Sequence, residues 1–358
     1  MDETLSLYEL SCVAKHFDTT SQFVNLMKTC KKYSDICDVF FVNPIPLDEQ
    51  NEKLFRHLTT QQITSEDAYI PPNKKNTLWF KKTNYKVVKP FESNDNIMEE
   101  VTYRREDYLS FGIEVPHCVN TIGTKCFENC NGPMLVNTIS GSVKKIDLFT
   151  KVIIPDLVNT LDSFAFHNCT QLTEVSLTPS ITKIGEKCFE NCCMLSKISG
   201  IEGENSALSQ LGKGCFKNCV SLVSIAFPPK VSILPEKCFD NCNSLAEITA
   251  FPQLIGHHCF NNCNSLKTVS FFGIGRTKEK TVVTIQMIGY KAFAGCRNLV
   301  DVRLNSAIGE FGVRCFEGCI SLTNVSPLPK IRGADCFKDC KLLNLKLDGG
   351  ENQATSMV

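Results

Sequence analysis

One nine-residue motif returns along most of this chain and constrains the fold more than any other feature. It is clearest over 184–192, where the letters are Ile-Gly-Glu-Lys-Cys-Phe-Glu-Asn-Cys. Its phenylalanine recurs at positions 127, 166, 189, 216, 239, 260, 293, 316 and 337. The gaps are 39, 23, 27, 23, 21, 33, 23 and 21, so the basic period is 23, with insertions of 16, 4 and 10 and two shorter gaps. Such a repeat predicts a solenoid, in which each unit buries its apolar face only against its neighbours.

A single unit can be followed between two successive copies of the motif. The stretch 172–177 ends in alternating apolar and polar residues, which predicts a short strand that is buried on one face. Pro179 ends this strand, and Gly185 allows a tight corner. The corner leads into a predicted helical turn over 188–192. Each unit should therefore hold one strand, one corner and one short helical return.

These positions carry a family resemblance. The pattern Cys-x-x-Leu-x-x-Ile-x-Leu-Pro-x-x-Val-x-x-Ile-x-x-x-Ala/Cys-Phe resembles the BspA-type leucine-rich repeat of bacterial surface proteins and parasitic protists, amoebae in particular. The resemblance implies an α/β solenoid, a leucine-rich-repeat arc with short parallel strands on one face and short helical or irregular turns on the other. Amoebic members carry a small, mainly helical domain in front of their repeats, and the N-terminal stretch with Asn43-Pro-Ile-Pro46 resembles it.

The chain outside the clear repeats divides into further segments. Residues 1–45 are predicted to form the helical domain, because apolar residues recur there at helical spacing. The segment 46–111 is expected to be irregular, with a β-hairpin over 78–88 and a solvated charged linker around 99–107. Repeats should fill 112–348, with a disordered tail over 349–358. The 16-residue insertion before Phe166 has room for a degenerate extra repeat.

Composition excludes several classes of partner. Lys and Arg number 38 and Asp and Glu also number 38, so no net charge draws in nucleic acid or an anionic membrane. The acidic start, without a long apolar core, argues against a secretory signal peptide, and no run of eighteen apolar residues predicts a membrane span. We therefore expect a cytoplasmic protein. Surface or membrane association is implied only by the resemblance to amoebic members.

The 21 cysteines are the strongest candidates for chemistry. Zinc needs about four converging ligands, whereas a solenoid spreads its cysteines along its axis, so no metal site is expected even beside His257-His258. Packing explains more, since free cysteine behaves as a small apolar residue and Ala165 and Ala292 take its first position. The second cysteine of each unit is predicted to donate weakly to a carbonyl of the adjacent turn. Sixteen cysteines follow the period: 126, 130, 169, 188, 192, 215, 219, 238, 242, 259, 263, 296, 315, 319, 336 and 340.

Catalysis finds little support in the sequence. The chain contains no phosphate-binding loop, no nucleophile elbow, no His-Glu-x-x-His zinc motif and no dinucleotide-binding glycine pattern. Its carboxylates are scattered, so no general acid and base pair can be nominated. We expect no enzyme activity and no cofactor.

A protein partner is expected on the concave face, where the strands of successive units lie side by side. The residues that flank each buried Val or Ile should point out of this sheet. They are Glu174, Ser176, Lys197, Ser199, Ser224, Ala226, Glu247, Thr249, Thr268, Ser270, Asp301, Arg303, Asn324 and Ser326. A second candidate is the inserted loop with Arg276, Lys278 and Lys280.

Three functions remain open at this stage. The first is a non-enzymatic protein-interaction module, with a surface-associated antigen or adhesion protein as its variant by resemblance. Residues 5–33 also resemble an F-box, a helical motif that docks onto a ubiquitin-ligase adaptor while the repeats select the substrate, although the usual leading Leu-Pro is missing. Zinc or redox chemistry at the paired cysteines is the third.

Overall fold

The computed structural model of the chain describes residues 5–65, 67–71, 77–81, 83–92, 96–131, 134–137, 143–146, 149–250, 252–270, 285–304 and 308–343. The chain divides into two compact units. The first contains the chain up to Tyr103 together with Cys118–Thr121, and the second contains Arg104–His117 and the chain from Ile122 onward. The tail predicted over 349–358 lies outside the described residues.

The first unit begins with two α-helices and two short 3₁₀ turns. Each α-helix starts at a capping box, in which a hydroxyl residue and a residue three positions later satisfy each other's backbone N–H groups. Ser6 and Glu9 form the box of the first helix, and Thr19 and Gln22 form that of the second. The elements are α1 (Leu7–Ala14), α2 (Thr20–Thr29), η1 (Lys31–Tyr33) and η2 (Ile36–Val39).

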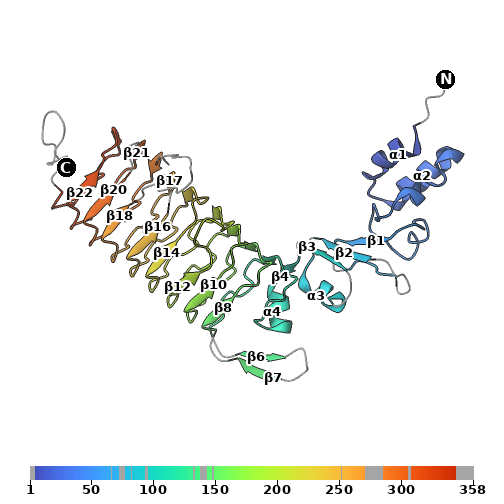
Figure 1. Ribbon diagram of the computed structural model, residues 1–358, viewed down its shortest axis with the longest axis horizontal. Helices are drawn as coiled ribbons and strands as arrows, with labels where there is room; N and C mark the ends of the chain where they lie inside the picture. The colour runs from blue at the N-terminus through green and yellow to red at the C-terminus, as the bar shows by residue number, and fades with distance from the viewer. Residues whose placement is uncertain are drawn as a thin grey trace. The chain divides into compact units, whose positions relative to one another are not determined.

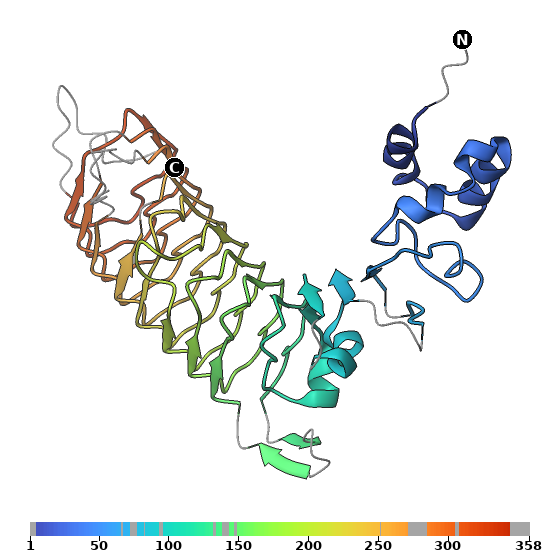
Figure 2. The ribbon, with the colours of Figure 1, turned by 45° about the vertical axis from the view of Figure 1, so that its right-hand side comes forward.

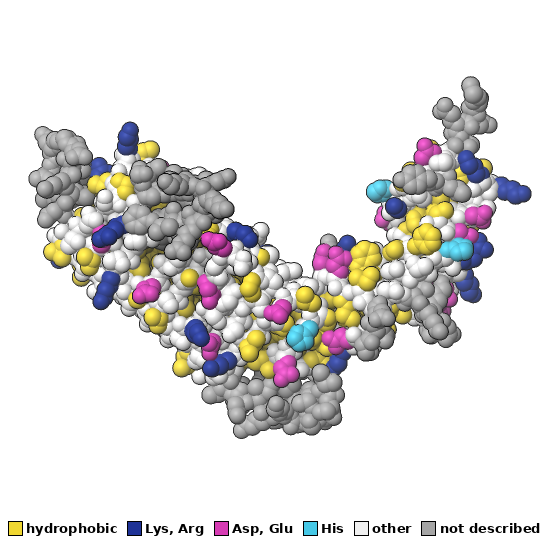
Figure 3. Space-filling model, in the orientation of Figure 1, with side chains coloured by type: hydrophobic (Ala, Val, Ile, Leu, Met, Phe, Trp, Pro, Cys, Tyr) yellow, Lys and Arg dark blue, Asp and Glu magenta, His cyan; other side chains and the backbone are white. Residues whose placement is uncertain are grey.

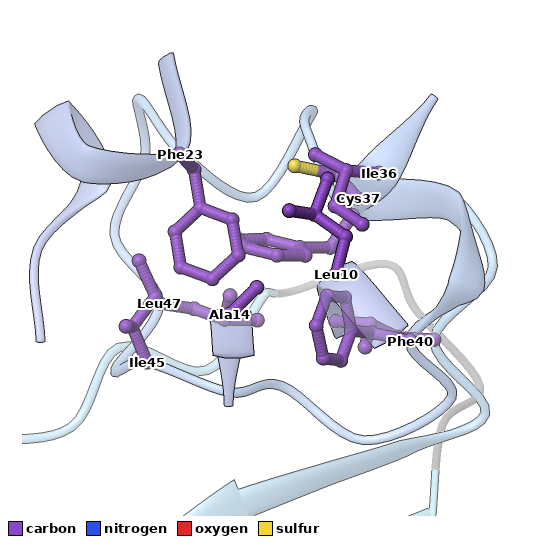
Figure 4. Close-up of a cluster of buried hydrophobic side chains, with 10 residues drawn as sticks. Leu10, Ala14, Phe23, Ile36, Cys37, Phe40, Ile45 and Leu47 are labelled. Atoms are coloured by element: carbon purple, nitrogen blue, oxygen red, sulfur yellow. The ribbon is translucent and has the colours of Figure 1, made fainter. Parts of the chain in front are cut away.

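These helices pack on a single apolar core, drawn in Figure 4. Phe23 lies at its centre, with its ring edge-on to Phe40 at 5.9 Å and to Phe55 at 5.4 Å between centroids. The same core includes Leu47 and Leu58, which follow the helices in the sequence. The domain that contains the helices therefore extends beyond residue 45, the boundary predicted from the sequence. The F-box hypothesis for this segment stays a prediction.

The segment 46–111 is more ordered than its sequence suggests. Three strands, β1 (Thr60–Ile63), β2 (Thr77–Lys81) and β3 (Ile97–Glu99), form a parallel sheet with β2 in the middle. The hairpin predicted over 78–88 is therefore wrong. Asn84 does not turn the chain into a second strand, because its side chain accepts the N–H of Val87 at 3.3 Å and starts a helix. The remaining elements here are α3 (Tyr85–Val88), η3 (Lys89–Phe91) and β4 (Thr102–Tyr103).

The charged run around 99–107 is not a solvated linker. It leads into α4 (Arg105–Phe111), where the buried Asp107 accepts the backbone N–H of Arg104 at 2.8 Å. The Arg105 guanidinium donates to the carbonyl oxygens of Cys126 at 3.2 Å and Glu128 at 2.8 Å. Arg105 thus caps the first repeat, whose carbonyls have no preceding coil to donate to them.

The second unit is a solenoid whose coils carry two short parallel strands each, one more than the sequence analysis predicted (Figures 1 and 2). Three-residue strands form one side of the coils: β8 (Lys151–Ile153), β10 (Glu174–Ser176), β12 (Lys197–Ser199), β14 (Ser224–Ala226), β16 (Glu247–Thr249), β18 (Thr268–Ser270), β20 (Asp301–Arg303) and β22 (Asn324–Ser326). Two-residue strands form another: β5 (Thr121–Ile122), β9 (Thr160–Leu161), β11 (Lys183–Ile184), β13 (Gln210–Leu211), β15 (Ile233–Leu234), β17 (Leu254–Ile255), β19 (Met287–Ile288), β21 (Glu310–Phe311) and β23 (Ile331–Arg332).

The 16-residue insertion holds a hairpin. Its strands β6 (Met134–Asn137) and β7 (Val143–Ile146) pair antiparallel, and β8 follows as the ordinary strand of the coil. The described residues of the insertion form no further repeat unit. Without its 16 residues, the 39 residues between Phe127 and Phe166 fall to the usual period of 23.

The repeated motif forms an irregular turn and not the predicted helical one. Lys187 and Asn191 have left-handed backbones, with φ of 52° and 64°, and the equivalent residues of the other coils share this conformation. The N–H of Phe189 then points along the axis and donates to Cys215 of the next coil at 2.8 Å. The motif phenylalanines stack through the core with neighbouring ring centroids 5.0–5.5 Å apart. This stack is the apolar column that the 23-residue period predicts.

Gly185 was predicted to allow a tight corner, but the structure gives it a different role. Its own φ is not left-handed, but a Cβ there would lie 2.5 Å from the backbone of Asp162 and Ser163 in the preceding coil. Glycine is therefore needed because two coils approach closely at this point.

Candidate functional site

The outward side chains of the three-residue strands form the surface that we call the strand face. Every residue predicted for it lies on it, and the alternation along the strands confirms the predicted register, since Val175 and Ile225 between them are buried. Glu174, Ser176, Ser199, Ala226 and Asp301 are half-buried. The exposed members are Lys197, Ser224, Glu247, Thr249, Thr268, Ser270, Arg303, Asn324 and Ser326. Their role in binding stays a prediction.

The strand face is not one continuous sheet as expected. Its hydrogen bonds form three blocks, β8 with β10 and β12, β14 with β16, and β18 with β20 and β22. The breaks follow coils of 27 and 21 residues, whose lengths depart from 23. The second candidate, the loop with Arg276, Lys278 and Lys280, lies outside the described residues.

In the first block of the strand face one glutamate lies between two lysines, so the cluster keeps one net positive charge. Lys151, Glu174 and Lys197 are aligned across three neighbouring strands. The Glu174 carboxylate contacts the Lys197 ammonium at 2.7 Å and that of Lys151 at 3.1 Å. The hydrogen bond from Lys197, followed by that from Lys151, lowers the pKa of Glu174, and the same contact raises the pKa of Lys197. All three lie near solvent, so the cluster is worth little to stability.

A neutral cluster lies in the last block. Arg303 pairs with Asp301 of its own strand, and Asn324 of the next strand donates to Asp301 at 2.7 Å. Asp301 is therefore already occupied. The Arg303 side chain stays 63% exposed, and within the described residues its guanidinium pairs with Asp301 alone, which leaves further N–H donors for a partner.

The middle block differs from its neighbours. Glu247 and Thr249 on β16 are exposed, and Glu247 lies beside Ser224 of β14. Among the described residues, neither the Glu247 carboxylate nor the Thr249 hydroxyl has an ion-pair or hydrogen-bond partner. This leaves one uncompensated negative charge at the centre of the strand face, between a cluster with one net positive charge and a neutral cluster.

The first strand of the strand face, β8, was not predicted from the sequence. Lys151 and Ile153 of β8 point outward, and Ile153 is 80% exposed. The inserted hairpin lengthens the gap between two motifs and so obscures the repeat at β8. The strand could have been predicted from Val152 and Ile154, which precede Val175 and Leu177 by 23 residues each.

The paired cysteines are packing groups, as predicted. All 21 are free thiols. The second cysteine of eight coils donates to the carbonyl oxygen of the phenylalanine in the preceding coil, at 2.9–3.2 Å. Burial raises the pKa of thiols such as Cys219 and Cys263, so they stay protonated and unreactive.

The histidine pair does not join a metal cluster. His257 uses Nδ1 to accept the N–H of Tyr290 at 2.8 Å, and His258 lies edge-on to the Tyr290 ring at 5.1 Å. Partial burial lowers the pKa of His258. Within the described ranges, no three His, Cys, Asp or Glu side chains are arranged to hold a metal ion.

A ladder of asparagine amides was also missed. In five successive motifs the left-handed asparagine donates its Nδ2 to the Oδ1 of the asparagine in the preceding coil, at 2.6–3.0 Å. Its members are Asn129, Asn168, Asn191, Asn218, Asn241 and Asn262. The signal was the Asn that precedes the second cysteine in the first six motifs, because asparagine tolerates the left-handed region. The ladder links neighbouring turns of the solenoid along its axis.

The face of the molecule drawn in Figure 3 carries mixed charge. Acidic and basic side chains alternate over the solenoid in Figure 3, and neither sign gathers into a large patch. No helix in the described part of the chain has the length and apolar character of a bilayer span.

Comparison with known proteins agrees with this architecture. The family model of the BspA type leucine rich repeat region matches residues 97–201, 137–267 and 253–355, which together exceed two thirds of the chain. No curated protein matches the chain significantly.

Similar solved structures are bacterial leucine-rich repeat proteins. A T. pallidum leucine rich repeat protein is 24% identical, with a TM-score of 0.40 over 54% of this chain and 89% of its own. A leucine rich cell surface protein of Faecalibacterium prausnitzii is 20% identical, with a TM-score of 0.35 over 63% and 82%. The turns, the phenylalanine stack and the family model all agree, and the chain belongs to the BspA type leucine rich repeat family.

Proposed function

We propose that this chain is a non-enzymatic protein-interaction module that binds its partner on the strand face. The observation that carries the proposal is the row of outward side chains on eight parallel strands, which offers an extended polar surface. Uncompensated Glu247 at its centre and the exposed guanidinium of Arg303 are its polar anchors. The buried, protonated thiols do not compete as a catalytic centre.

The experiment compares captured proteins between matched variants. Glu247→Arg reverses the central charge of the strand face. Glu186→Arg makes the same change at an exposed carboxylate in the repeated motif over 184–192, away from the three-residue strands. Tagged wild-type chain and both variants are purified from the native cell, and their partners are identified by mass spectrometry. The partner should remain with Glu186→Arg and be lost, by about tenfold or more, with Glu247→Arg. A partner retained equally by both variants would place binding elsewhere.

A cytoplasmic location stays a prediction of the sequence. It is tested by trapping the thiols with iodoacetamide during lysis and counting oxidised cysteines by mass spectrometry. Because the buried thiols are unreactive, the informative cysteines are the exposed Cys12 and the half-buried Cys30, Cys118 and Cys193, which should be reduced in a reducing compartment. Extensive oxidation would overturn that location.

A further inference from the structure

The strand β8 is an edge of the strand face. Its block runs from β12 through β10 to β8 and ends there. The apolar core at this end is closed by α4, whose Tyr108 ring packs edge-on against Phe127 at 5.0 Å between centroids. The helix leaves Ile153 80% exposed. The helix therefore does not cover the outward face of β8 at Ile153.

The direction of each backbone group on β8 follows from its pairing. The carbonyl of Thr150 accepts the N–H of Glu174 at 3.2 Å, and the N–H of Ile154 donates to Ser176 at 2.9 Å. In a parallel pair, alternate residues bond to alternate sides. Lys151 and Ile153 thus direct their N–H and C=O groups away from β10. Neither residue has a backbone partner on that side within the described chain.

The side chains of this edge add a charge pattern. Lysine and glutamate alternate across the block, from Lys197 through Glu174 to Lys151. Lys151 is bonded on one side only, and its side chain is 70% exposed. A carboxylate on a strand added outside β8 would continue the alternation at the ordinary strand spacing of about 4.8 Å. A side chain two residues further along the added strand would lie beside the exposed side chain of Ile153.

From these observations we propose that β8 binds an extended peptide strand of a partner protein, which carries an acidic and an apolar side chain two residues apart. Backbone bonds to Lys151 and Ile153 fix the strand, the Lys151 ammonium pairs with the acid, and Ile153 packs on the apolar residue. This is the strand-addition mode of peptide recognition. The inference rests on the proposed protein-binding role and adds the place where a partner's backbone is recognised.

The decisive variant removes the N–H of Ile153 and leaves the backbone hydrogen bonds between β8 and β10 in place. Ile153→Pro deletes an N–H that points to the open edge, a position where strands tolerate proline. Ile153→Thr keeps the N–H and the branched side chain, and is its matched control. Random twelve-residue peptides displayed on phage are selected on the full-length chain, and enriched peptides are synthesised. Their affinities for wild type and both variants are measured by fluorescence anisotropy, with circular dichroism as the check on folding.

Selected peptides should carry the acidic and apolar pair. Ile153→Pro should weaken their binding by about tenfold or more, and Ile153→Thr by less than about threefold. Lys151→Glu should weaken binding similarly, and replacing the peptide's acid by lysine should restore it.

Three results would overturn the inference: no peptide is selected, selected peptides bind Ile153→Pro as well as wild type, or the edge pairs only with a second copy of the chain. The last is detected as a change in sedimentation between wild type and Ile153→Pro. None of these results depends on Glu247, so the strand-face proposal is tested separately.

Discussion

The asparagine ladder gives the sharpest test of how the motif is built. Asn218 has a left-handed backbone with φ of 60° and lies within the ladder. Its amide donates to Asn191 at 2.7 Å and accepts from Asn241 at 2.9 Å. Two effects are thus combined in one side chain, a backbone preference and two hydrogen bonds. Replacing Asn218 by Gly and by Ala separates them.

Glycine removes the side-chain bonds but accepts a left-handed backbone freely. Both bonds are partly open to water, so their loss should cost about 0.5 kcal/mol each, and glycine's extra unfolded-state entropy about 0.5 kcal/mol more. Alanine loses the same bonds and also forces its Cβ into the left-handed region, at about 1–2 kcal/mol. Asn218→Gly should therefore cost about 1.5 kcal/mol and Asn218→Ala about 2–3 kcal/mol. Gly295 and Gly318 already occupy the equivalent position in two later coils.

Urea unfolding followed by far-ultraviolet circular dichroism measures these differences as shifts in the midpoint. Equal slopes for the three proteins are required, because only then does a midpoint shift report stability alone. The expected order is wild type, then Asn218→Gly, then Asn218→Ala. An alanine variant as stable as the glycine variant would refute the backbone argument. A glycine variant as stable as wild type would show that the amide ladder contributes nothing.

Three further predictions concern the thiols and the first repeat. Cys219→Ala removes a buried thiol together with its hydrogen bond to the Phe189 carbonyl, whereas Cys215→Ala removes a buried thiol whose partner is the Cys238 thiol. Cys219→Ala should therefore destabilise the chain by about 1 kcal/mol more in urea unfolding, and equal losses would contradict a stabilising role of the thiol–carbonyl bonds. Arg105→Ala should lower stability by about 2 kcal/mol, and Arg105→Gln by less, as measured by thermal melting; an unchanged melting temperature would contradict the cap. Burial raises the pKa of Cys37 from 9.0 to about 11, so its neutral thiol stabilises the fold below pH 9 and this contribution is lost as pH rises to about 11. Cys37→Ala should flatten the alkaline fall in stability, and an unchanged fall would assign it to other groups.

Most of the solenoid was predictable because its determinants repeat. Phe189 and its eight equivalents occupy one column, and their spacing fixes the coil length before any contact is known. The outward residues of the strand face followed from alternation around Val175. The turn conformation was misjudged, because Cys188 and Cys192 four residues apart suit a helical turn as well as the irregular turn observed.

The wrong predictions for residues 78–88 and for the charged run with Arg105 have one cause, which is pairing with residues far away in the sequence. The sequence over 78–88 favours a strand locally, but β2 pairs with β1 and β3, which lie up to about twenty residues away, and Asn84 begins a helix. Arg105 looked like part of a solvated run, because the carbonyls that it caps belong to residues more than twenty positions later.

By itself, the sequence determined the repeat, its period and the apolar and polar faces of each coil, since these depend on residue type and spacing. Only the tertiary structure decided where coils meet without a strand pair, which helix closes the first repeat and which edge stays open at β8. Those outcomes depend on backbone groups far apart in the chain, which any residue type can supply. The side chains specify the coil, and the contacts between coils specify its ends and breaks.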